Sequence, residues 1–321
     1  MINNSNFTKF LIVLGTTKSG SGAIFDYLVG RGDINDPLRG QEYHLPQMPN
    51  GLMALESASK KAFHPGTADY VLSQFEDIVK ILSRPQTRWH YGMDYKSRIP
   101  LFKESIKIFI DEICSAKLPM RLHWRKITQD QSPLIYLFNK LKNRLGFNEL
   151  VHNSRLIVSP DELIIAAQKL HNRLFENNNH MQPTILNQAG SGWNPINSTK
   201  YFENRKIILS TRDPRDQFAE LKQLKKATSV HGFIDWYKEM QRHIENISDP
   251  SLLHLRFEEF INVNQKSVGS ICQHVSLDSK ISSNYDPNSS KKNIGKFKKI
   301  LNLKEINSIE KKLSEYLYLQ K

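Results

Sequence analysis

The segment that most restricts the fold lies near the start of the chain. Five apolar residues at positions 10–14 lead directly into a glycine- and serine-rich segment, residues 15–22. Residues 23–28 then have the apolar spacing of a helix. A buried strand, a glycine-rich loop and a helix in this order form half of a βαβ unit. We therefore predict an α/β chain with a central parallel sheet flanked by helices.

The same alternation continues along the chain. Hydrophobic periodicity predicts helices over residues 68–82, 102–113, 214–226, 234–247 and 304–319, and strands over 89–95, 184–187, 206–211 and 252–256. Residues 117–180 differ, because basic clusters accompany helical patterns there. One of these helices begins with Ser159 as N-cap and Glu162 as its capping-box partner. We expect a mostly helical insertion at about 98–183 within a single domain that spans 1–321.

The net charge favours an anionic partner. Lysine and arginine number 45 against 32 aspartates and glutamates, a formal charge of +13. Charge by itself does not distinguish nucleic acid, a membrane surface and a phosphorylated small molecule. No apolar run approaches the roughly 20 residues that span a bilayer, and Cys114 and Cys272 lack the spacing of a zinc site or a disulfide framework. We expect a cytoplasmic protein with no transmembrane anchor and no metal.

The glycine-rich loop fits a phosphate group. Its glycines let backbone N–H groups converge on an anion, and the N-terminus of the following helix adds its dipole. A Walker A loop has lysine and then serine or threonine directly after its second spaced glycine, whereas Lys18 here precedes Gly20. The loop thus favours a phosphate-type ligand over a nucleoside triphosphate with Mg²⁺. A plain turn between strand and helix is the alternative.

A second candidate site follows the predicted strand 206–211. Arg212 lies at the carboxyl end of that strand, where open α/β sheets bind ligands, and a guanidinium can bind phosphate in a bidentate manner. Asp213 and Pro214 suit the N-cap and the first residue of the next helix. Asp216 also favours the start of that helix.

Three segments together resemble the sulfotransferases that use 3′-phosphoadenosine 5′-phosphosulfate. Residues 18–22, Lys-Ser-Gly-Ser-Gly, resemble the loop that binds the 5′-phosphosulfate in that family. Residues 212–216, Arg-Asp-Pro-Arg-Asp, resemble its 3′-phosphate motif. Residues 290–298 are similar to the basic segment that closes over the nucleotide, with Phe297 where the family usually has tryptophan. The resemblance does not extend to residues 98–183.

The resemblance implies a three-layer, P-loop-like fold and sulfuryl transfer from 3′-phosphoadenosine 5′-phosphosulfate without a metal. Lys18 would neutralise the charge that grows on the leaving phosphate. The donor would be bound by Thr17, Lys18, Ser19, Gly20, Ser21, Gly22, Arg212, Lys291 and Lys292. Where the family usually has a serine that shares the 3′-phosphate, this chain has Glu220. Either Glu220 turns away, or Lys222 or Gln223 serves instead, or the donor binds weakly.

The segment Gln41-Glu42-Tyr43-His44 is the candidate for the acceptor side. It resembles the Glu-x-His of heparan-type glycan sulfotransferases, in which the glutamate is the general base. In an extended segment Glu42 and His44 project to the same side, so Glu42 would accept the proton and His44 would orient it or contact the acceptor. A solvated glutamate with a half-buried histidine is the alternative. His64 and His90 are alternative bases.

The acceptor is expected to be a carbohydrate or another small molecule with a hydroxyl group. Lys96, Gln188 and Trp193 are candidate contacts to it, with a surface or loop role as the alternative. The cluster Arg121, His123, Trp124 and Arg125 is a further candidate, although a role in covering the core of the insertion is favoured.

Two other functions compete with sulfuryl transfer. One is a P-loop kinase, which the position of Lys18 disfavours. The other is a non-enzymatic module that binds polyanions through lysines 291, 292, 296, 298 and 299. No recognised nucleic-acid fold accompanies these lysines, so we expect no nucleic-acid partner.

Overall fold

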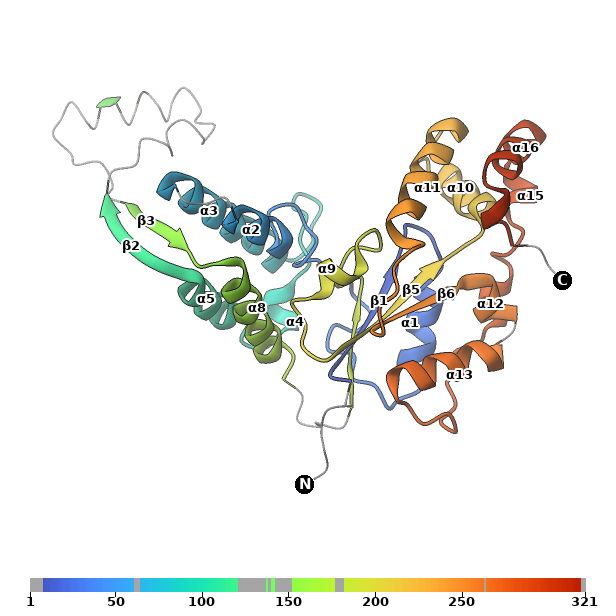
Figure 1. Ribbon diagram of the computed structural model, residues 1–321, viewed down its shortest axis with the longest axis horizontal. Helices are drawn as coiled ribbons and strands as arrows, with labels where there is room; N and C mark the ends of the chain where they lie inside the picture. Colours follow the sequence, from blue (N-terminus) through green and yellow to red (C-terminus); the bar gives the residue numbers. More distant parts are fainter. Residues whose placement is uncertain are drawn as a thin grey trace. The chain divides into compact units, whose positions relative to one another are not determined.

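The computed structural model describes residues 8–60, 64–120, 137, 140–141, 152–176, 182–262 and 264–318 (Figure 1). The chain divides into two compact units, one formed by Met1–Gln47 with Phe175–Lys321 and the other by Met48–Leu174. The second unit begins well before residue 98, where the sequence placed the insertion. The description of the chain as one domain stays a prediction.

The first unit is built on a parallel sheet, as the sequence predicted. Within the described residues the sheet has four strands in the order β4-β1-β5-β6, and every neighbouring pair is parallel. Its strands are β1 Phe10–Gly15, β4 Thr184–Asn187, β5 Arg205–Thr211 and β6 Leu252–Arg256. Residues 10–14 of β1 are completely buried. A strand that is covered on both faces needs a continuous apolar sequence rather than an alternating one.

Helices flank this sheet. They are α1 Ser21–Val29, α9 Pro195–Thr199, α10 Pro214–Gln223, α11 Val230–Ile244, α12 Phe257–Asn262, α13 Asn264–Val275, α14 Asn288–Lys291, α15 Phe297–Ile300 and α16 Leu303–Lys312. Helices α1, α12 and α13 share a core with every second residue of β1, Leu11 and Val13. Helices α10 and α11 contact each other through Phe218 and Phe233, whose ring centroids are 5.0 Å apart. Because helices cover the faces of the sheet, the loops that follow the strands lie at the carboxyl ends of the strands.

The second unit combines helices with a strand pair. Its elements are α2 Leu52–Ser59, α3 Pro65–Ser83, α4 Tyr95–Arg98, α5 Phe102–Ile113, β2 Cys114–Met120, β3 His152–Ile157 and α8 Pro160–Leu174. The N-terminus of α8 is capped as predicted, because the Ser159 hydroxyl accepts from the Glu162 N–H at 3.5 Å and the Ser159 N–H donates to Glu162 Oε2 at 3.0 Å.

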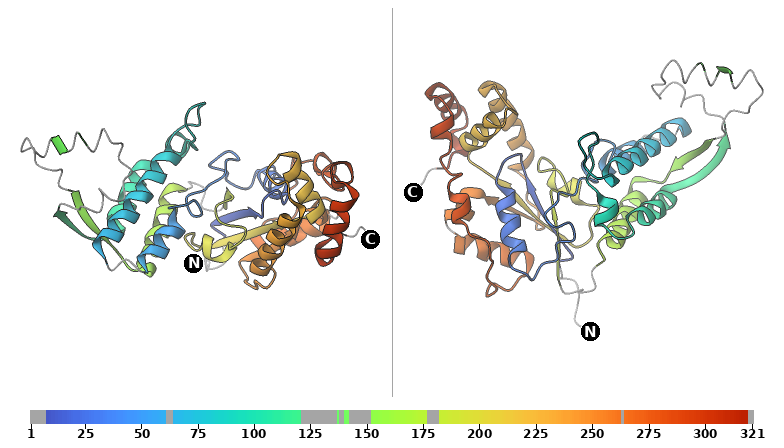
Figure 2. Two further views of the ribbon diagram at one scale, coloured as in Figure 1. Left: turned by 90° about the horizontal axis from the view of Figure 1, so that it is seen from above. Right: turned by 180° about the vertical axis from the view of Figure 1, so that it is seen from behind.

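Two expectations for the second unit are corrected. The predicted strand 89–95 is wrong, because the Thr87 N–H donates to the His90 carbonyl in a turn and Trp89 is 82% exposed. The predicted helical character of residues 117–180 is incomplete, because β2 and β3 pair antiparallel there and β3 packs against α3 (Figure 2). Pro119 lies within β2, where it is tolerated because each strand of a two-stranded sheet has a free edge.

Part of the predicted insertion lies outside the described residues. This applies to the cluster Arg121, His123, Trp124 and Arg125 and to most of residues 134–145, where the sequence predicts a helix. Among the described helices, none combines the length and the apolar character that crossing a bilayer requires.

Candidate functional site

The glycine-rich loop between β1 and α1 is tightly wound. Thr17 and Lys18 have φ values of 69° and 57°, in the left-handed region that non-glycine residues rarely adopt. Gly20 follows with a φ of 86° and is the N-cap of α1. A Cβ atom at Gly20 would lie 2.3 Å from Cδ2 of Phe257, so glycine is required here for both conformation and space. Such strained backbone persists where the surrounding structure holds it.

Buried amide side chains fasten this loop. Gln217 of α10 is completely buried, and its Nε2 donates to the carbonyls of Thr16 and Thr17 at 2.7 Å and 2.5 Å. From the end of β4, Gln188 accepts a hydrogen bond from the Gly15 N–H at 3.2 Å and donates to the Ser21 hydroxyl at 2.9 Å. Gln217 was missed by the sequence analysis, because a glutamine in the first turns of a helix has no pattern that distinguishes it from a surface residue.

A cavity of about 570 Å³ lies above the loop at the carboxyl end of the sheet, entirely within the first unit. The predicted site residues that line it are Thr17, Lys18, Ser19, Gly20, Ser21, Gly22, Glu42, His44, Gln188, Trp193, Arg212 and Glu220. The fold thus brings four separate segments, residues 17–22, 42–44, 188–193 and 212–220, to the same cavity. Lys291 and Lys292 are exposed and do not line the cavity, whereas their neighbours Ser290 and Asn293 do.

Arg212 is a buried junction at the wall of the cavity. Its side chain is 2% exposed. Its Nη1 donates to the Lys18 carbonyl at 3.0 Å, and its Nη2 donates to the Asn293 carbonyl at 2.7 Å. Its Cζ atom lies 5.1 Å from the ring centroid of Phe257. The guanidinium thereby joins the loop to the segment that follows α14.

Glu220 also reaches Arg212. Its Oε2 accepts a hydrogen bond from Arg212 Nη1 at 2.7 Å, and its Oε1 lies 3.8 Å from Lys18 Nζ. Glu220 therefore does not turn away from the site. Lys222 does not replace the usual serine either, because its Nζ donates to both carboxylate oxygens of Glu305, at 2.6 Å and 2.8 Å. A carboxylate thus stands beside the two cations that were expected to bind the donor.

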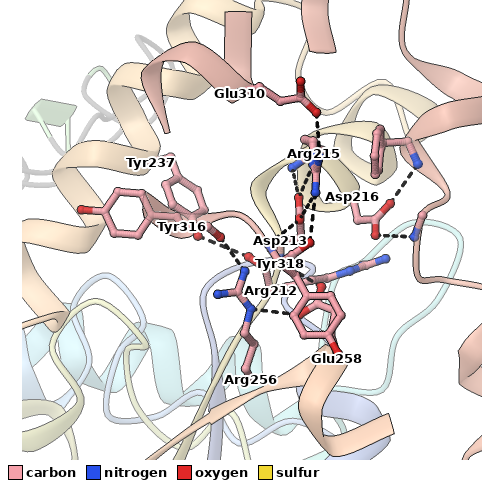
Figure 3. Close-up of polar contacts among 12 residues, drawn as sticks. Arg212, Asp213, Arg215, Asp216, Tyr237, Arg256, Glu258, Glu310, Tyr316 and Tyr318 are labelled. Atoms are coloured by element: carbon pink, nitrogen blue, oxygen red, sulfur yellow. Dashed lines mark hydrogen bonds and ion pairs between the residues drawn. The ribbon is translucent and has the colours of Figure 1, made fainter. Parts of the chain in front are cut away.

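The residues after Arg212 form a second polar layer (Figure 3). Asp213 is the N-cap of α10, as predicted, and accepts from the Arg215 N–H at 2.8 Å and from the Tyr318 N–H at 2.8 Å. The buried carboxylate of Glu258 accepts from the Asp213 N–H at 2.9 Å. Burial raises the pKa of Glu258, and the hydrogen bond from Asp213 opposes that rise. The N-terminus of α10 is therefore held from several directions.

Asp216 does more than favour the start of α10. It is 1% exposed, and its two carboxylate oxygens accept from the N–H groups of Gly295 and Phe297 at 2.7 Å and 2.9 Å. Burial raises its pKa, while these hydrogen bonds act in the opposite direction. Phe297 is buried under Arg215, whose Cζ is 4.4 Å from its ring centroid. Asp216 thus anchors the C-terminal basic segment to the first turn of α10.

Glu42 and His44 lie together on the cavity wall. Glu42 forms a parallel bridge with Asn187 of β4, and the Tyr43 N–H donates to the Asn187 carbonyl at 2.8 Å, so the segment is extended. Glu42 Oε2 lies 3.3 Å from His44 Nε2. The hydrogen bond from His44 lowers the pKa of Glu42; burial opposes this, and the charge of Lys18 adds to the lowering. The two side chains thus project to the same side, with Glu42 50% exposed and His44 16% exposed; their roles in the reaction stay a prediction.

The alternative bases, His64 and His90, belong to the second unit. His64 is the N-cap of α3, where its Nδ1 accepts from the Gly66 N–H at 3.2 Å. His90 lies in the exposed turn before α4, and Lys96 lies in α4 itself. Trp193 does line the cavity, and its ring centroid is 5.1 Å from that of Trp236. Trp193 therefore contributes an aromatic side chain to the cavity that Glu42 also lines.

Comparison with known proteins yields structural neighbours only. No family model and no curated protein sequence matches the chain. The sulfotransferase domain of the Synechococcus PCC 7002 olefin synthase is similar with 10% identity and a TM-score of 0.42, over 100% of this chain and 99% of that one. The sulfotransferase domain of the curacin biosynthetic pathway has 11% identity and a TM-score of 0.39, over 98% and 99%. A sulfotransferase from Mycobacterium tuberculosis H37Rv has 8% identity and a TM-score of 0.38, over 96% and 77%.

Proposed function

We propose that this chain is a sulfotransferase that binds 3′-phosphoadenosine 5′-phosphosulfate and transfers its sulfuryl group to a hydroxyl of a carbohydrate or another small molecule. The observation that carries the proposal is the meeting of the Lys18 loop, Glu42 and Arg212 on the wall of the same cavity. A cavity of about 570 Å³ is within the range of small-molecule sites. Its place at the carboxyl end of a parallel sheet is where such folds bind ligands.

The loop residues fit the 5′-phosphosulfate end of the donor. The N-terminus of α1 directs unpaired backbone N–H groups and its positive dipole end at an anion. Ser21 adds a hydroxyl. Lys18 extends from a fastened loop, so its ammonium group would lie beside the leaving phosphate before the reaction begins. A preorganised charge of this kind stabilises a transition state without reorganisation.

In the proposed reaction the acceptor oxygen attacks the sulfur in line with the departing phosphate. The bond from sulfur to the bridging oxygen breaks as the bond from sulfur to the acceptor forms. Glu42 accepts the hydroxyl proton, and its lowered pKa keeps it ionised at neutral pH. His44 fixes its orientation through their 3.3 Å contact. The products are the sulfated acceptor and 3′-phosphoadenosine 5′-phosphate.

The donor and the reaction are tested separately. Calorimetric titration with 3′-phosphoadenosine 5′-phosphate and with ADP tests the donor class, and we expect binding of the first. Transfer of ³⁵S from labelled donor into extracts that contain candidate acceptors tests the chemistry. Binding of ADP with Mg²⁺ but not of the 3′-phosphorylated nucleotide would favour a kinase. Steeply salt-dependent binding of DNA without nucleotide affinity would favour the polyanion-binding module.

A further inference from the structure

The cavity contains an anion of its own. Glu220 extends from α10 to the wall of the cavity, 2.7 Å from Arg212 Nη1 and 3.8 Å from Lys18 Nζ. Its side chain is 22% exposed, so its charge is only partly screened by water. Two of the cations available to an anionic ligand therefore already share a counter-charge.

Two of the five hydrogen-bond donors of Arg212, the Nε–H and one N–H of Nη2, have no partner among the described residues and remain for a phosphate. A guanidinium has five N–H donors. Those of Nη1 are directed at the Lys18 carbonyl and at Glu220, and Nη2 donates to the Asn293 carbonyl. The side chain is 2% exposed and stacks on Phe257. A phosphate that approached this side chain would have to displace Glu220 or lie beside its negative charge.

The charge of the cavity is correspondingly small. Among the described residues that line it, Lys18, Arg212 and Lys226 are cationic and Glu42 and Glu220 are anionic, which leaves a net charge of +1. A phosphate at the loop uses Lys18 and the helix N-terminus. A second phosphate beside Arg212 would face Glu220, and like charges brought together at a binding site weaken the complex.

We propose that Glu220 makes the Arg212 end of the cavity a site for a hydroxyl group rather than for a second phosphate. The ligand class is then a nucleoside 5′-phosphosulfate or 5′-phosphate whose ribose hydroxyl donates to the Glu220 carboxylate. In dinucleotide-binding proteins a carboxylate likewise accepts a ribose hydroxyl, whereas an arginine accommodates a phosphate at that position. This inference rests on the proposed function, because it takes the loop as the 5′-phosphosulfate site. It replaces the 3′-phosphorylated donor named there with a donor whose ribose hydroxyl is free.

Calorimetry with adenosine 5′-phosphate and adenosine 3′,5′-bisphosphate tests this role. We expect the wild-type protein to bind the bisphosphate no more tightly than the 5′-phosphate. Glu220→Gln should tighten bisphosphate binding by roughly tenfold or more, because it removes the like charge. The same variant should change 5′-phosphate binding by less than about threefold, since the amide oxygen still accepts a hydroxyl.

Two further variants separate the charge of Glu220 from general effects. Glu220→Asp keeps the charge, so it should keep the wild-type ratio of the two dissociation constants. Glu112→Gln is the matched control, because Glu112 accepts a hydrogen bond from Arg173 at 3.0 Å with comparable exposure and does not line the cavity. It should leave both constants unchanged. Thermal unfolding of each variant verifies that it is folded.

The possible failures are distinguishable. If the wild-type protein binds the bisphosphate tenfold or more tightly than the 5′-phosphate, and Glu220→Gln leaves that ratio unchanged, the inference is overturned and the proposed donor class stands. If neither nucleotide binds to the wild-type protein or to Glu220→Gln, the donor class itself is overturned, and the inference with it.

Discussion

The reactivity proposed for Lys18 depends on how its backbone is held. Its φ of 57° lies in the left-handed region, and its carbonyl accepts from Arg212 Nη1 at 3.0 Å. The ammonium group, on a side chain that is 35% exposed, therefore extends from a fixed point toward the cavity. A charged group that extends from a backbone held in this way can act as a preorganised stabiliser of a developing charge.

Replacing Lys18 with alanine should lower kcat by roughly 100- to 1,000-fold, the range found when one preorganised group is removed from a developing charge. Transfer of ³⁵S to the acceptor measures the loss. Lys226→Ala is the matched control, because Lys226 also lines the cavity but is exposed. A loss of kcat that is equal in the two variants would contradict a specific role for Lys18.

His44 should control the pH dependence of Glu42. A general base acts when it is deprotonated. Because the pKa of Glu42 lies below the ordinary glutamate value of 4.5, activity should persist to a lower pH than with an ordinary glutamate. His44→Gln removes the largest cause of the lowering and should move the acidic limb of kcat/KM to higher pH. A pH–rate profile measures the shift. His90→Gln, in an exposed turn, should leave the limb in place; an unchanged limb in His44→Gln would refute the assignment of Glu42 as base.

At the scale of elements, the N-terminus of α1 lies in close contact with the start of α12. Gly20 lies against the Phe257 ring at the start of α12, and its φ of 86° suits glycine. Gly22 lies in the first turn of α1, where an added Cβ would meet nothing within 4 Å. Although they are two residues apart, only Gly20 has a conformation and a neighbour that exclude a side chain.

Gly20→Ala should therefore lower the free energy of unfolding by about 1–2 kcal/mol for the left-handed conformation, and further through the clash with Phe257. Gly22→Ala should raise it by about 0.5–1 kcal/mol, because alanine favours a helix over glycine. Urea denaturation measures both changes. Equal effects in the two variants would show that this loop is looser than its hydrogen bonds indicate.

At the same scale, elements with a local signal were predicted well. The helix over 102–113 and the strand over 252–256 match α5 and β6, because their apolar periodicity is read within a few residues. The predicted strand 89–95 was wrong. An apolar pattern forms a strand only where a neighbouring strand pairs with it, and here Trp89 is exposed to solvent. The pair β2–β3 was missed because pairing between Pro119 and Asn153 is a long-range contact.

At the scale of the whole molecule, the charge of +13 and the charge of the cavity differ greatly. The described lining residues leave the cavity a net charge of +1. Most of the excess lysine and arginine therefore lies elsewhere in the chain. The affinity for a small nucleotide should follow the local charges, because distant ones are screened beyond about 10 Å at 0.1 M salt.

Raising the salt concentration from 0.1 M to 1 M, where the screening length falls to about 3 Å, should weaken adenosine 5′-phosphate binding by less than about tenfold. Calorimetry at several salt concentrations measures the slope. A loss of roughly a thousandfold or more would instead match the release of many counterions, and would favour the polyanion-binding alternative.

The sequence by itself determined the parallel sheet, the loop before α1 and the caps of α8 and α10. These depend on residues within a few positions of each other, such as Ser159 with Glu162. Only the tertiary structure decided that Gln217 fastens the loop and that Glu220 lies between Arg212 and Lys18. Contacts between residues some two hundred positions apart depend on the path of the whole chain, which local propensity does not encode.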